Sequence, residues 1–104
     1  MKLIPDLVTF EAEVLNNTGT VLVDFYSDNC APCRMMTPVL EEVSKERTDL
    51  KVVKVDAATN FDVAVKFGIT AVPTFLLIKG GQICGQFSGT RSKRGMLSWI
   101  DSSR

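Results

Sequence analysis

The segment Cys30-Ala31-Pro32-Cys33 constrains the fold most, because a strand pattern ends just before it and a helix pattern begins within it. Residues 21–26 form a near-continuous run of apolar and aromatic side chains, typical of a strand that is covered on both faces. Beyond the cysteines, apolar side chains recur at helical spacing, at Met36, Val39, Leu40 and Val43. The cysteine pair is therefore predicted at the junction of a buried strand and a long helix.

The rest of the chain alternates helix and strand patterns in the same way. Helices are predicted over residues 10–15, around the apolar face of Met96, Leu97 and Ile100, and from a cap at Thr59 or Asn60 to Gly68. Strands are predicted over residues 52–55, 74–78 and 82–87, the last two forming a hairpin around Gly80-Gly81. Pro38 predicts a kink in the long helix. This order predicts an α/β fold with a central mixed β-sheet flanked by helices on both faces, in a single domain over residues 1–104.

The composition disfavours several classes of function. Twelve basic and twelve acidic residues cancel, so no surface for nucleic acid is expected. No run is long enough to span a membrane, and Pro5 and Asp6 interrupt the apolar stretch that a secretory signal would need. The absence of histidine removes Ser-His and Cys-His hydrolase schemes. Three cysteines do not make a disulfide-stapled secreted fold, so a cytoplasmic location is expected.

Two cysteines three residues apart at a helix N-terminus suit thiol–disulfide exchange. They share a helix face, so a disulfide can form between them with little backbone movement. The positive end of the helix dipole lowers the pKa of a thiol placed there. Cys30, at the open end, is the predicted nucleophile, and Cys33, expected to be more buried, is the predicted resolving cysteine. A zinc site would need four ligands, and a structural disulfide would need an oxidising compartment. Redox chemistry is therefore favoured, and no metal is expected.

Asp24 is the one charged residue in the most apolar strand, six residues before Cys30. A buried carboxylate without a partner has a raised pKa, which makes Asp24 the candidate acceptor of the Cys33 proton. The alternative is that Asp24 faces a solvated rim at the end of the strand. Lys54, the polar break in the strand over residues 52–55, either pairs with Asp24 or extends its ammonium into water.

Together these segments resemble the thioredoxin family over nearly the whole chain. The matching features are Val-Asp-Phe-Tyr before the cysteines, Cys-Ala-Pro-Cys-Arg, Pro38, Val72-Pro73-Thr74 and Gly89. The resemblance implies a thioredoxin fold and a monomeric protein-disulfide reductase that has no bound cofactor and is re-reduced by a thioredoxin reductase. It also implies a cis bond before Pro73, beside the disulfide, where the backbone of Val72 would pair with an extended segment of a disulfide-containing protein substrate.

Three positions near the cysteines depart from the family pattern. The family usually has tryptophan where Tyr26 and Asn29 stand, and glycine where Ala31 stands. These changes alter the apolar rim that meets substrates and leave the two-cysteine mechanism intact. The expected substrate-binding residues are Asn29, Ala31, Pro32, Val72, Pro73 and Gly89. Two alternatives remain: an oxidant or isomerase of the same fold, and a binding module in which redox turnover is incidental.

The third cysteine, Cys84, lies in the second strand of the hairpin. Strand alternation places Cys84 on one face with Gln82 and Gln86, and Ile83 on the other face with Phe87. Cys84 is expected to be a packed small side chain rather than a regulatory thiol.

Overall fold

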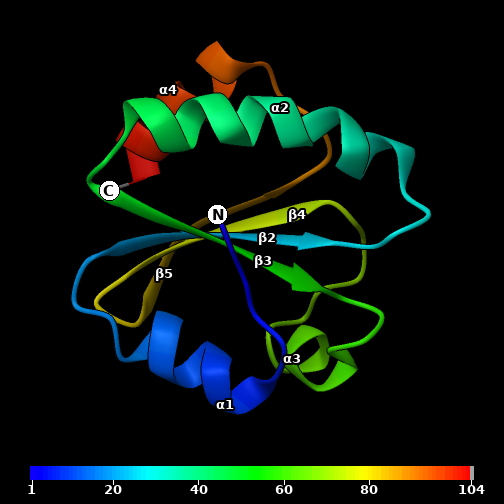
Figure 1. Cartoon of the computed structure of the whole chain (residues 1–104). Helices are drawn as coiled ribbons and strands as arrows, with labels where there is room; N and C mark the ends of the chain where they lie inside the picture. Colours follow the sequence, from blue (N-terminus) through cyan, green and yellow to red (C-terminus); the bar gives the residue numbers. More distant parts are fainter. Residues whose placement is uncertain (104) are drawn as a thin grey trace.

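Five strands form one mixed sheet in the computed structural model, which describes residues 1–103 (Figure 1). The strand order is β1-β3-β2-β4-β5, with β1 and β2 parallel to β3, and β4 antiparallel to both β2 and β5. The mixed sheet and the hairpin that the sequence predicted are thus confirmed. The strand bounds are β1 Lys2–Leu3, β2 Thr20–Tyr26, β3 Leu50–Asp56, β4 Thr74–Lys79 and β5 Gln82–Ser88.

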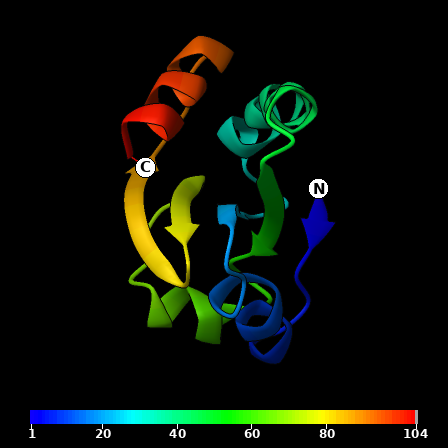
Figure 2. The same ribbon diagram turned by 90° about the vertical axis from the view of Figure 1, so that its left-hand side faces the viewer.

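Helices cover both faces of this sheet, as predicted. Figures 1 and 2 show α2 and α4 on one face, and α1 and α3 on the other. A π-helical segment, η1, continues α1. The bounds are α1 Leu7–Phe10, η1 Glu11–Leu15, α2 Ala31–Glu46, α3 Phe61–Lys66 and α4 Lys93–Ser103. Pro38 lies inside α2, where the kink stays a prediction.

Two apolar cores lie on the two faces of the sheet, and β2 contributes to both. The core toward α1 and α3 includes Phe10, Val21, Val23, Phe25 and Val63. The core toward α2 and α4 includes Leu22, Met36, Leu40, Phe75 and Trp99. Because successive side chains of a strand point to opposite faces, Asp24 lies on the same face of β2 as Leu22, toward α2. The strand pattern therefore places a carboxylate beneath the helix that carries the cysteines.

The first helix begins earlier than the sequence predicted. It starts at Leu7, where the side chain of Asp6 caps it by accepting a hydrogen bond from the Thr9 amide (2.7 Å). The chain then widens into η1, in which the Asn16 amide donates to the Glu11 carbonyl five residues back (2.9 Å). The prediction of a helix start at residue 10 was wrong, because the capping aspartate lies outside the apolar repeat on which that start was based.

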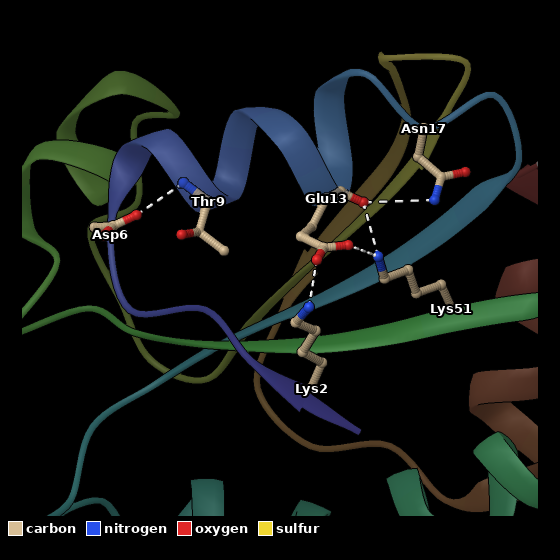
Figure 3. A network of polar contacts seen from close by, with 6 residues as sticks. All are labelled: Lys2, Asp6, Thr9, Glu13, Asn17 and Lys51. Atoms are coloured by element: carbon tan, nitrogen blue, oxygen red, sulfur yellow. Dashed lines mark hydrogen bonds and ion pairs between the residues drawn. The ribbon is translucent and has the colours of Figure 1, made fainter.

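Glu13 joins this helical segment to the sheet (Figure 3). Its carboxylate forms ion pairs with Lys2 on β1 and with Lys51 on β3, and the Lys51 ammonium also donates to the Glu13 carbonyl oxygen (3.3 Å). Hydrogen bonds from these two lysines lower the pKa of Glu13 to about 2. A single carboxylate thus connects η1 to β1 and to the more distant strand β3.

Cys84 is exposed, which corrects the expectation that it packs as a small apolar side chain. Cys84 lies on the outer strand β5, and Gln82 and Gln86, which share its predicted face, are exposed as well. The register of the hairpin also shifts here: Leu77 pairs with Gly85, whereas Ile78 pairs with Ile83. Cys84 is therefore the extra residue of a bulge, and the alternation assumed for residues 82–87 breaks at this point.

Candidate active site

Cys30 and Cys33 form a disulfide at the start of α2, with Cα atoms 5.2 Å apart. Cys30 is the N-cap residue, with extended backbone (φ −119°, ψ 104°), and its Sγ accepts a hydrogen bond from the Cys33 amide (3.2 Å). Pro32 lies in the first turn, where an amide proton would have no intrahelical partner. A thiolate at Cys30 would therefore meet a backbone donor and the positive end of a helix of 16 residues.

The exposure of the two cysteines differs from what the sequence predicted. Cys30 is 7% exposed and Cys33 is 6% exposed, so burial does not distinguish them in the disulfide state. The reason is that Cys30 Sγ lies 3.8 Å from the carbonyl oxygen of Val72, in a segment that packs against it. The side chains around the disulfide, Asn29, Ala31 and Pro32, are exposed and form its rim.

The peptide bond between Val72 and Pro73 is cis, as the family resemblance implied. Val72 is half-buried and Pro73 is buried, immediately before the start of β4. Gly89 lies beside this bond, because its amide donates to the Pro73 carbonyl oxygen (2.9 Å). Its φ of +96° is open to glycine at little strain. These contacts bring Val72, Pro73 and Gly89 together with Cys30, although they are far apart in the sequence.

Thr74 holds the same segment and was missed as a site residue at the sequence level. Its hydroxyl donates to the Ala71 carbonyl oxygen (2.6 Å) and lies 2.7 Å from the Ser88 hydroxyl. Thr74 is only 1% exposed, so its hydroxyl needs these partners. The sequence feature that could have identified Thr74 is its hydroxyl side chain at the first position of a buried strand.

Asp24 is buried, with 2% of its surface exposed, so it does not face a solvated rim. Its Oδ1 has no hydrogen-bond partner among the described residues. Burial raises the pKa of Asp24 from 3.8 to about 6, and the charge of Lys54 opposes that rise. A carboxyl group with such a pKa exchanges protons close to neutral pH.

Lys54 pairs with Asp24 in the register of β2 and β3, so the two side chains are neighbours on one face of the sheet. None of the ion pairs among residues 1–103 joins them. Instead, the Lys54 Nζ lies over the Tyr26 ring, 4.5 Å from its centroid. Lys54 therefore acts on Asp24 by its charge at a distance, which differs from both arrangements considered for the sequence.

Two small cavities lie near the disulfide, and one of them is lined by Cys33. One, of about 250 Å³, lies on the Cys33 side and is lined by Tyr26, Ser27, Asp28, Cys33, Arg34, Thr37 and Lys54. Arg34 contributes to its shape because its guanidinium donates to the Asp28 carbonyl oxygen (3.0 Å). The other, of about 240 Å³, lies on the Val72 side and is mostly apolar, with Ala57, Phe61, Ala64, Ile69, Ala71 and Val72 in its walls. A polar cavity therefore reaches Cys33, and a mostly apolar cavity lies beside Val72.

Within the described part of the chain, residues 1–103, no helix is long and apolar enough to cross a membrane. The same residues contain no group of three or more His, Cys, Asp or Glu side chains that could hold a metal ion.

Comparison with known proteins gives a consistent result. The Thioredoxin family model matches residues 4–102. A thioredoxin of Rickettsia bellii is 38% identical over 96 residues, which are 91% of each chain. A bifunctional thioredoxin reductase/thioredoxin of Mycobacterium leprae is 41% identical over 90 residues, 86% of this chain and 20% of that protein. The X-ray structure of Fasciola hepatica thioredoxin superposes with a TM-score of 0.91 at 30% identity, covering 100% of both chains.

Fold, site and relatives therefore agree. The five-stranded mixed sheet with helices on both faces is the thioredoxin fold. The disulfide at the N-terminus of α2 fits the redox site of a protein disulfide oxidoreductase. This chain belongs to the thioredoxin family and is a thiol–disulfide oxidoreductase.

Proposed function

We propose that this protein reduces disulfides in other proteins, with Cys30 as the nucleophile and Cys33 as the resolving cysteine. One observation carries the proposal: Cys30 Sγ caps α2, accepts the Cys33 amide hydrogen bond and lies beside the Val72 carbonyl oxygen. The helix N-terminus stabilises a thiolate at Cys30, and the Val72 backbone offers a place for the chain that bears the substrate disulfide.

The reaction passes two electrons from the dithiol to the substrate. The Cys30 thiolate attacks one sulfur of the substrate disulfide, forms a mixed disulfide and releases the other sulfur as a thiolate. Cys33 then loses its proton, and its thiolate attacks Cys30 Sγ. This breaks the mixed disulfide, releases the second substrate thiolate and leaves the Cys30–Cys33 disulfide.

Asp24 is the proposed acceptor of the Cys33 proton. It lies on the α2 side of the central strand, and burial raises its pKa to about 6. A base whose pKa is near the working pH is protonated and deprotonated readily within one catalytic cycle. The chain has no histidine to take this role.

Substrate contacts are assigned to the exposed rim and to the segment at the cis bond. Asn29, Ala31 and Pro32 surround the disulfide, and together they give this protein an atypical Asn-Cys-Ala-Pro-Cys site. Val72, Pro73 and Gly89 complete the surface on the other side of Cys30. The apolar hollow beside Val72 accommodates an uncharged segment of the substrate.

A thioredoxin reductase is the proposed source of electrons for the Cys30–Cys33 disulfide. The relative that unites a reductase and a thioredoxin in one protein supports this partner. We further infer that the chain acts as a single domain and a monomer, in the cytoplasm, where glutathione and reductases keep thiols reduced.

The test is to trap the mixed disulfide with insulin as the substrate. All variants carry Cys84→Ser, because the exposed Cys84 thiol would form adducts of its own. Cys33→Ser should accumulate a covalent adduct through Cys30 that a reducing agent releases, and Cys30→Ser should form none. Equal trapping by both variants, or by neither, would refute the assigned roles.

A measurement of the Cys30–Cys33 reduction potential in graded thiol–disulfide buffers tests the direction of the reaction. A potential more negative than that of the cytosolic glutathione pool is expected. A markedly less negative value would assign the protein to oxidation or isomerisation instead.

A further inference from the structure

The Tyr26 ring lies against the ammonium of Lys54, the residue that pairs with Asp24 across β2 and β3. We propose that Tyr26 is a positioning residue of the redox site: its ring holds the Lys54 ammonium close to the Asp24 carboxylate but out of ion-pair contact with it. This inference rests on the proposed role of Asp24 as proton acceptor. It gives a specific task to a position at which this chain departs from the family's usual tryptophan.

The register of the sheet is the first support. Asp24 and Lys54 are direct partners across β2 and β3, and Tyr26 stands two residues further along β2, on the same face. Neighbouring strands lie about 4.8 Å apart, and a lysine side chain is long enough for its ammonium to reach a carboxylate on the next strand. Lys54 does not do so, because its Nζ is 4.5 Å from the centroid of the Tyr26 ring.

The state of the carboxylate is the second support. Asp24 Oδ1 is buried and has no hydrogen-bond partner within residues 1–103, so this oxygen is available to accept a bond from the half-buried Lys54 beside it. An ion pair between Lys54 and the buried Asp24 would move the ammonium away from water, which costs free energy. Contact with the face of the Tyr26 ring instead keeps the ammonium beside the 250 Å³ cavity that both residues line. The aromatic face therefore competes with Asp24 for the ammonium.

Few other charges bear on Asp24. On β4 its partner is the apolar Phe75, and α2 contributes Cys33 and the exposed Arg34, whose guanidinium is bound to the Asp28 carbonyl oxygen. Burial raises the pKa of the Tyr26 phenol, and the nearby charges of Asp56, Asp28 and Asp24 raise it further. Among the residues that the structure describes, Lys54 is the one whose charge perceptibly lowers the pKa of Asp24. The position of this ammonium therefore controls the basicity of the carboxylate.

The consequence concerns the strength of the base. With Lys54 on the ring, burial outweighs its charge and the pKa of Asp24 is about 6. An ion pair would stabilise the charged form of Asp24 and lower its pKa. A weaker base would accept the Cys33 proton less readily, so the ring preserves the proton-accepting capacity of the site.

The test is an NMR titration of the Asp24 carboxyl carbon in the oxidised protein, which requires no turnover. Tyr26→Leu removes the aromatic face, and the pKa of Asp24 should fall from about 6 to about 5 or below, as expected for a carboxylate that gains an adjacent cation. Tyr26→Phe is the matched control: it keeps the ring face and should leave the titration of Asp24 unchanged. A Tyr26→Leu titration that matches wild type would overturn the proposal.

Lys54→Met tests whether Tyr26→Leu acts by releasing the Lys54 ammonium or by letting water reach Asp24. The single variant should raise the pKa of Asp24, because the charge that lowers it is lost. Adding Tyr26→Leu to Lys54→Met should then produce no further shift, since no ammonium remains to be released. If the fall caused by Tyr26→Leu persists without Lys54, the ring acts only by excluding water, and the positioning role is wrong.

A further measurement uses the wild-type protein alone, so it does not depend on whether a variant folds. The Lys54 methylene protons nearest Nζ should resonate upfield in wild type because of the ring current of Tyr26, and random-coil positions for these protons would refute the contact. The proposed function fails separately: if Asp24→Asn resolves a mixed disulfide at the wild-type rate, Asp24 is not the proton acceptor, whatever the titrations show.

Discussion

Replacement of Asp24 by asparagine is expected to stabilise the oxidised protein at neutral pH, because wild type must bury an ionised carboxylate when it folds. The pKa of Asp24 is 3.8 as an isolated group and about 6 in the folded protein. Each pKa unit corresponds to about 1.4 kcal/mol, so burying the charge costs about 3 kcal/mol above pH 6. With Asp24 only 2% exposed, solvent screens little of this cost.

The pH dependence follows from the sign of the shift. Below pH 3.8 the carboxyl is neutral in both the folded and the unfolded states, so it imposes no cost. As the pH rises from 3.8 to about 6, the unfolded state ionises first and wild type loses stability. Asparagine does not titrate, so the advantage of Asp24→Asn should grow from near zero to about 3 kcal/mol across this window.

Urea unfolding of the two oxidised proteins, followed by the fluorescence of the buried Trp99, measures this difference. The experiment is done at about pH 7.5 and about pH 3.5, on either side of the window. Asp56→Asn is the matched control: Asp56 is also buried, but it accepts hydrogen bonds from the Ala58 and Thr59 amides, so this variant should gain no stability. A difference between Asp24→Asn and wild type that is the same at both pH values would refute the reasoning.

Two further predictions concern the scaffold. Glu13→Gln should remove part of the acid sensitivity of folding. The lowered pKa of Glu13 stabilises the folded protein above pH 4.5, and this stabilisation is lost as the pH falls toward about 2. In acid unfolding curves, the difference in stability between wild type and Glu13→Gln should therefore shrink over that range. Gly81→Ala should lower the free energy of unfolding by more than about 2 kcal/mol, because its φ is +79° and a Cβ would lie 2.6 Å from the Leu15 carbonyl oxygen. The control Gly80→Ala, with φ +56° and open space around the Cβ, should cost only about 1–2 kcal/mol, and equal losses in urea would contradict the steric argument.

The elements that carry a long apolar period were predictable from the sequence, and so was the place of the site. Apolar residues at helical spacing located α2, and the unbroken apolar run located β2, so the position of Cys30 between them followed directly. By contrast, β1 has only two residues, Lys2 and Leu3, and two residues display no period. It forms through pairing with β3, which depends on the folded chain.

Contacts that depend on exact geometry were not predictable. The bulge at Cys84 is a change of register in one strand, and the sequence of that strand still alternates as if the change were absent. Lys54 could be identified as a neighbour of Asp24. Its contact with the Tyr26 ring could not, because strand spacing does not determine the direction of the Lys54 side chain. The near-equal burial of Cys30 and Cys33 likewise depends on a segment more than 40 residues away, at Val72.

The central position of β2 in the sheet determines how readily this strand opens to solvent. β2 is hydrogen-bonded to β3 from Thr20 to Tyr26 and to β4 from Thr20 to Phe25, so both of its edges are occupied. Backbone amides in such a strand exchange with solvent mainly when the whole domain opens. Asp24 belongs to this strand, and Cys30 follows its last residue by four positions. We therefore expect amides of the outer strands β1 and β5 to exchange faster than those of β2, the strand that leads into the redox site.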